Sequence, residues 1–70
     1  MTIPKRTQVQ LNSQAKYLII ERYERIAGQN LHGFLPMRNA PYYKKAKQES
    51  ITICDRYNDI ELRKEIELNF

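Results

Sequence analysis

The stretch KRTQVQLNSQAKYLIIERYERIAG, residues 5–28, decides which fold the chain can adopt. Its apolar residues first alternate with polar ones, as in a strand, and then recur at helical spacing. Residues 5–11 alternate between polar and apolar side chains, which is the pattern of a β-strand with one covered face. Val9 and Leu11 belong to the apolar face of this strand. The opposite face carries Arg6, Gln8 and Gln10. A strand this short buries little surface alone, so we expect it to pair with a partner strand.

A helix is predicted directly after the strand, from Gln14 to Ala27. Asn12 and Ser13 are both favourable N-caps, because their side-chain oxygens can accept hydrogen bonds from the free amides of the first turn. Gly28 favours the end of the helix, because glycine adopts the left-handed conformation without steric cost. Apolar residues recur at helical spacing through the segment, at Ala15, Leu18, Ile19, Tyr23 and Ile26.

Two prolines interrupt the middle of the chain. Asn30 can cap a second helix, but Pro36 inside that helix would remove a hydrogen bond and clash, at a cost of about 3 kcal/mol. Either the second helix is a short turn over residues 30–35 that restarts near Pro41, or it is kinked. Since proline is favourable at the first position of a helix, we predict a helix over residues 41–50.

The last twenty residues, 51–70, combine a β-branched segment with a helical pattern. The β-branched alternation of residues 51–54 favours an extended backbone. Asn58 or Asp55 can cap a final helix over residues 59–68.

Length and cysteine content limit how the fold can be stabilised. A chain of about 60 residues buries only roughly 60 % of its unfolded surface, so the core of a 70-residue chain is small. Cys54 is the single cysteine, so no internal disulfide is possible, and together with the single His32 it is too little for a zinc site. Oligomerisation is the remaining device for a small fold, and we expect a homodimer.

The sequence contains no apolar run suited to a signal peptide or to a membrane span of about 20 residues. We therefore expect a soluble protein in a reducing, cytoplasmic compartment, with no membrane partner.

Charge is distributed unevenly along the chain. Residues 1–50 contain nine lysines and arginines against three acids, a net charge of +6, whereas residues 51–70 contain three against five, a net charge of −2. This asymmetry indicates two surfaces with different partners, of which the basic one suits phosphate groups. Two ordinary solvated faces are an equally simple interpretation.

No catalytic constellation is visible, and we expect neither an enzyme nor a cofactor. His32 stands alone, and the acids of residues 51–70 alternate with lysine and arginine as on a solvated helix face. Only Gly28 and Gly33 are present, so the chain has no glycine-rich phosphate loop.

The order of elements over residues 5–35 resembles the ribbon-helix-helix family of DNA-binding dimers, and most of all the antitoxins that partner acetyltransferase toxins. The resemblance implies a transcriptional repressor whose paired strands form a ribbon in the major groove of double-stranded DNA. It implies base contacts by Arg6, Gln8 and Gln10, since glutamine can bond adenine and arginine can bond guanine. Backbone amides that open the second helix would hold a phosphate, and the matching positions are Gln29, Asn30 and Leu31. Lys44 and Lys45 are further candidates for phosphate contacts.

In those antitoxins a C-terminal segment wraps the toxin, and residues 51–70 are the counterpart here. The apolar candidates for contact with such a protein partner are Ile53, Tyr57, Ile60, Ile66 and Phe70. The expected fold is therefore mainly α with one short N-terminal β-strand: a ribbon-helix-helix-like homodimer over residues 1–50 and a C-terminal helical, partner-binding extension over residues 51–70.

Three alternatives stay open. The chain could be a small inhibitor or interaction protein from a mobile element that binds a host protein without binding DNA. It could instead be a helix-turn-helix module in which residues 30–50 supply the recognition element. In either case, residues 51–70 could pack back on their own domain instead of binding a partner.

Overall fold

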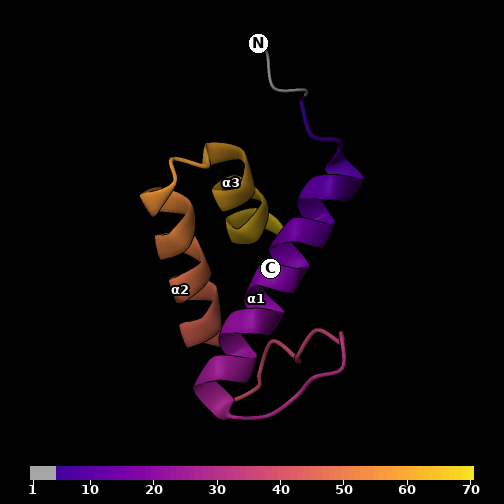
Figure 1. Cartoon of the computed structure of the whole chain (residues 1–70), viewed down its shortest axis with the longest axis vertical. Coiled ribbons are helices and arrows are strands. Elements are labelled where there is room, and N and C mark those ends of the chain that lie inside the picture. The colour runs from indigo at the N-terminus through magenta and orange to yellow at the C-terminus, as the bar shows by residue number, and fades with distance from the viewer. Residues whose placement is uncertain (1–4) are drawn as a thin grey trace.

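Three helices make up the computed structural model, which describes residues 5–70 (Figure 1). Helix α1 spans Gln8–Ala27, α2 spans Tyr43–Arg56 and α3 spans Ile60–Asn69. A loop connects α1 to α2, α2 returns beside α1, and α3 packs against both helices. Residues 5–70 include no β-strand, so the expected strand, and with it the ribbon-helix-helix-like architecture, is wrong.

The predicted strand is the first turn of α1, and a capping box explains why. The Thr7 hydroxyl accepts a hydrogen bond from the Gln10 amide, and the Gln10 side chain accepts one from the Thr7 amide. This reciprocal pair satisfies two amides that would otherwise lack partners, so the helix begins before the predicted N-caps Asn12 and Ser13. The predicted end is confirmed, because Gly28 caps α1 in the left-handed conformation with φ of 67°.

The prolines lie in the long connection between α1 and α2, where neither of them interrupts a helix. Residues 30–35 form turns and no helix. Helix α2 begins two residues after Pro41 and continues past residue 50, so the extended segment predicted for residues 51–54 is wrong. Ser50 is buried there, and its hydroxyl donates a hydrogen bond to the Ala46 carbonyl, which satisfies this polar group within the helix.

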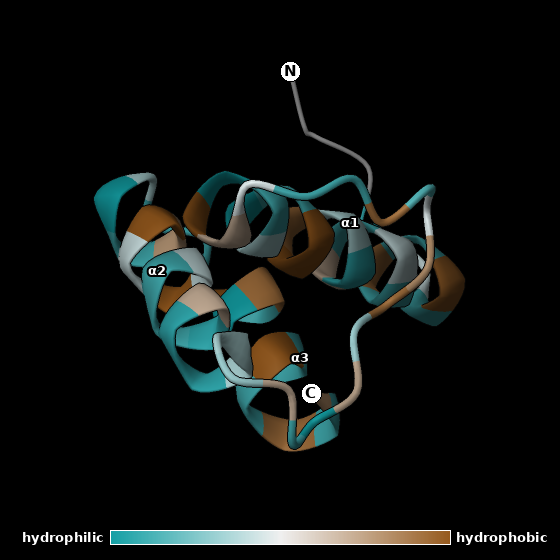
Figure 2. Cartoon of the chain, turned by 90° about the horizontal axis from the view of Figure 1, so that it is seen from below, coloured by the Kyte–Doolittle hydropathy of each residue, from teal (hydrophilic) through white to brown (hydrophobic). Residues whose placement is uncertain are grey.

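The core lies between the three helices, where their apolar sides meet (Figure 2). The buried cluster takes residues from every helix: Ala15, Ile19, Tyr23, Tyr43, Ala46, Cys54 and Ile66. Ile66 of α3 is fully buried in it, and the Tyr43 hydroxyl donates a hydrogen bond to the Phe70 carbonyl. The C-terminal residues therefore pack back on their own chain. The boundary drawn between residues 1–50 and 51–70 falls within α2.

Candidate nucleic-acid interface

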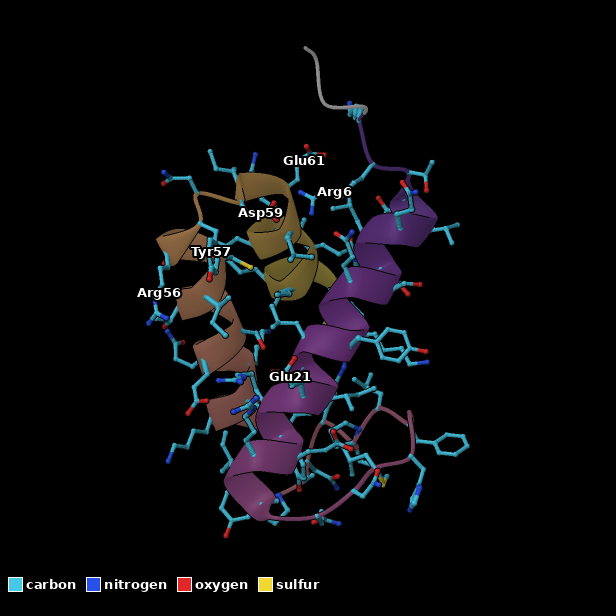
Figure 3. All side chains as sticks on the ribbon, viewed as in Figure 1. Arg6, Glu21, Arg56, Tyr57, Asp59 and Glu61 are labelled. Atoms are coloured by element: carbon cyan, nitrogen blue, oxygen red, sulfur yellow. The ribbon has the colours of Figure 1, made fainter. Side chains whose placement is uncertain are left out.

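The three side chains expected to read bases face their own chain. The Arg6 guanidinium donates hydrogen bonds to both carboxylate oxygens of Asp59, the N-cap residue of α3, and a further one of 2.7 Å to Gln14 Oε1 (Figure 3). Gln8 Nε2 donates to Glu65 Oε1 at 2.6 Å, and Gln10 is occupied in the capping box. The arginine bond keeps the pKa of the Asp59 carboxyl below its usual value, since it stabilises the charged form.

The residues expected to anchor a phosphate, Gln29, Asn30 and Leu31, lie in the loop after α1. They do not open a helix. The Leu31 amide donates a hydrogen bond of 2.8 Å to the Glu24 carboxylate, and the Asn30 side chain accepts one from the His32 amide. Two polar groups of this segment are therefore already engaged within the chain.

Lys44 and Lys45 lie in the first turn of α2 and are both exposed. The fold brings them to the same end of the molecule as the C-terminal part of α1 (Figure 1). We call the cations of these neighbouring segments the basic end: Arg22, Arg25, Lys44, Lys45 and Lys47. The charge total of residues 1–50 had included Arg22 and Arg25, but it did not show that they lie near the lysines of α2.

The arginines and lysines of the basic end differ in their ion pairing. Arg22 and Arg25 of α1 bind Glu21 at 3.1 and 3.4 Å. Within the part of the chain that the structure describes, the three lysines have no carboxylate within 4 Å. Their charge is therefore available to a phosphate-bearing partner.

The start of α2 adds to this positive potential. Its N-cap Tyr42 makes no capping hydrogen bond through its side chain, and its first turn contains lysines and no acid. Lysines in a first turn are unfavourable for the helix itself, because the helix dipole is positive at that end. The same arrangement attracts an anion, since free amides and cationic side chains lie together.

A small hollow of about 220 Å³ lies farther along the surface between α1 and α2. Its lining includes Arg22, Arg56 and the carboxylate of Glu49, whose Oε1 lies 3.9 Å from Arg22 Nη1. Arg22 Nε is buried and has no hydrogen-bond partner within residues 5–70. Glu49 already places a carboxylate beside Arg22, so this hollow adds no separate anion site to the basic end.

The residues expected to contact a protein partner are separated by the fold. Tyr57 and Ile60 are 75 % and 66 % exposed and line a hollow of about 760 Å³ together with Arg6 and Glu61 (Figure 3). Ile66 belongs to the core, while Ile53 and Phe70 are half-buried. Of these five residues, only Tyr57 and Ile60 are both exposed and close to each other.

Residues 5–70 contain no group of three or more histidine, cysteine or acidic side chains able to hold a metal ion. Burial raises the pKa of the Cys54 thiol, which disfavours the reactive thiolate.

No helix of the described part of the chain is both long and apolar enough to cross a membrane. Comparison of the chain with models of protein families, with curated proteins and with solved structures finds no match.

Proposed function

We propose that the protein binds double-stranded DNA through phosphate contacts made by its basic end. The observation that carries this proposal is the concentration of cations without a carboxylate partner at the start of α2, on Lys44, Lys45 and Lys47. Residues 51–70, which contain α3, have the opposite balance, with three basic residues against five acids. Such a charge dipole orients the molecule toward a polyanion.

Lysine contacts with phosphate release condensed counterions, which supplies affinity without base recognition. The first turn of α2 can place a phosphate near its amides while Lys44 and Lys45 contact neighbouring phosphates. Arg6, Gln8 and Gln10 take no part, because each is engaged within the chain. Binding is therefore tolerant of sequence, with a dissociation constant in the range of roughly 10⁻⁴ to 10⁻⁶ M at physiological salt.

Charge variants test this assignment. We expect Lys44→Gln combined with Lys45→Gln to weaken binding of a fluorescent 20-base-pair duplex by about tenfold or more, measured by anisotropy at fixed salt. The variant makes fewer phosphate contacts, so its binding releases fewer counterions. The matched control, Lys5→Gln with Lys64→Gln, removes the same charge outside the basic end and is expected to change binding by less than about threefold. Equal losses in the two double variants would contradict a localised interface.

A second candidate function is binding of a host protein without DNA, for which the exposed pair Tyr57 and Ile60 provides an apolar surface. The two side chains line one hollow, and apolar side chains that are exposed together mark contact surfaces more than single exposed ones do. This function predicts no saturable binding of the duplex by the unmodified chain, so the same titration separates the two.

A further inference from the structure

Glu65 of α3 is a buried carboxylate without a cationic partner. Its residue is only 6 % exposed, and no lysine, arginine or histidine nitrogen of residues 5–70 lies within 4 Å of its carboxylate oxygens. Burial of an ionised carboxylate is costly unless hydrogen bonds or an opposite charge compensate for the lost water.

Three neutral amides supply the hydrogen bonds that Glu65 does receive. Gln8 Nε2 donates to Oε1 at 2.6 Å, while Asn69 Nδ2 at 3.0 Å and Asn12 Nδ2 at 3.5 Å donate to Oε2. These amides come from α1 and α3, so the carboxylate joins the two helices. They satisfy lone pairs, but they leave the negative charge in place.

A hollow of about 420 Å³ opens over this carboxylate, lined by Gln8, Val9, Asn12, Ser13, Glu65 and Asn69. Because the amide nitrogens point to Glu65, the side-chain carbonyl oxygens of Gln8, Asn12 and Asn69 are left without hydrogen bonds within residues 5–70. The groups still available to an occupant are therefore mainly acceptors, next to an uncompensated negative charge. Val9, which is 75 % exposed, adds an apolar wall.

We propose that this hollow binds a guanidinium group carried on an aliphatic stem, the chemistry of an arginine side chain from a partner protein. Guanidinium has five N–H donors in a plane and no acceptor, which matches a carboxylate beside amides whose oxygens are free to accept hydrogen bonds. The methylenes of the stem would lie against Val9. The site lies on the α1–α3 face and is independent of the basic end, so it does not depend on DNA binding.

Titration with N-acetylarginine methylamide at low salt, followed by NMR of the side-chain amides of Asn12 and Asn69, tests the site. We expect saturable shifts for the full-length protein and at least a tenfold weaker response in Glu65→Gln, which keeps the shape but removes the charge. Tetramethylammonium, a cation without N–H donors, should leave these signals unchanged. No saturable shift, or an equal response in Glu65→Gln or to tetramethylammonium, would overturn the proposal.

A second variant keeps the test decisive if Glu65→Gln does not fold. Val9→Arg introduces a guanidinium at an exposed helical position beside the hollow, and we expect it to compete with the added ligand and reduce its binding at least tenfold. Unchanged binding would count against the site. Agmatine tests whether the guanidinium comes from a protein side chain or from a free metabolite. Weaker binding of agmatine than of N-acetylarginine methylamide supports a protein side chain. Tighter binding of agmatine overturns that source in favour of a free metabolite.

Discussion

At the scale of single residues, Arg6 shows why chain position does not reveal a role. Its guanidinium binds the Asp59 carboxylate 53 positions away, and that carboxylate also accepts a hydrogen bond from the Leu62 amide at the start of α3. Asp59 had been predicted to lie at the start of the last helix, and Asn58 or Asp55 to cap it. Sequence alone could not show that Asp59, once it served as the cap, would also bind an arginine from the other end of the chain.

The Arg6–Asp59 pair predicts a pH dependence of stability. The arginine lowers the folded-state pKa of Asp59, so the pair stabilises the protein above the unfolded-state pKa of about 3.9 and loses its effect as pH falls through the lower, folded-state value. Both side chains are partly exposed, so we expect Arg6→Gln to cost about 1 kcal/mol at pH 7. Thermal melts should show this difference between wild type and variant shrink below pH 4.

Asp59→Asn is the control for that experiment, because asparagine also caps helices but is not ionised. It should lower the melting temperature at pH 7 and respond little to Arg6→Gln added in the same chain. An Arg6→Gln effect of the same size at pH 2.5 and pH 7 would rule out the ion pair as its cause.

At the scale of elements, hydrophobic patterns were most informative at helix ends marked by their own caps. The end of α1 at Gly28 followed from such a signal. The last helix, predicted over residues 59–68, is found at Ile60–Asn69, but the predicted caps Asn58 and Asp55 were wrong because Asp59 caps it. The alternation over residues 5–11 was misleading, because Leu11 also begins a row of buried residues four apart that continues through Ala15 and Ile19. The Thr7–Gln10 spacing was the signal that could have located the start of α1.

The C-terminal half of α2 was missed for a related reason. Residues 51–53 have β-branched side chains, yet the small buried residues Ala46, Ser50 and Cys54 recur every four positions and require a helix in that register. Local propensity favoured a strand, and tertiary packing decided for the helix.

The capping box gives a prediction at this scale. Thr7→Ala removes the hydroxyl that accepts the Gln10 amide, so we expect the free energy of unfolding to fall by about 1 kcal/mol in urea denaturation. Thr7→Ser keeps an oxygen in this position and should cost much less. A strand over residues 5–11 would predict the reverse of this order or no difference, because no hydroxyl would then cap a helix.

At the scale of the whole molecule, α3 completes the core, because it packs against both α1 and α2 and contributes Ile66 to the buried cluster. Chain truncation after Ser50 would remove Cys54 and Ile66, two members of the buried cluster, together with half of α2. We therefore expect the 1–50 fragment to lack the cooperative thermal transition that the full chain shows, since so small a core cannot lose this area. A fragment that melts cooperatively near the full-length temperature would show that residues 51–70 are a separate, partner-binding extension.

The distribution of charge over the same fold carries the functional proposal. The phosphate anchor expected on residues 29–31 depended on a helix that does not form there, whereas Lys44 and Lys45 lie in the first turn of α2. Composition predicted a basic surface, but the arrangement of the helices was needed to show that the arginines of α1 lie near the lysines of α2.

The salt dependence of duplex binding tests the central claim most directly. We expect the logarithm of the binding constant of the wild type to fall linearly with the logarithm of salt concentration, with a slope of about −0.9 per phosphate contact. In Lys44→Gln with Lys45→Gln the magnitude of this slope should decrease by about two, while Lys5→Gln with Lys64→Gln should leave it unchanged. A wild-type slope near zero, or the same slope in all three proteins, would contradict phosphate binding by the basic end.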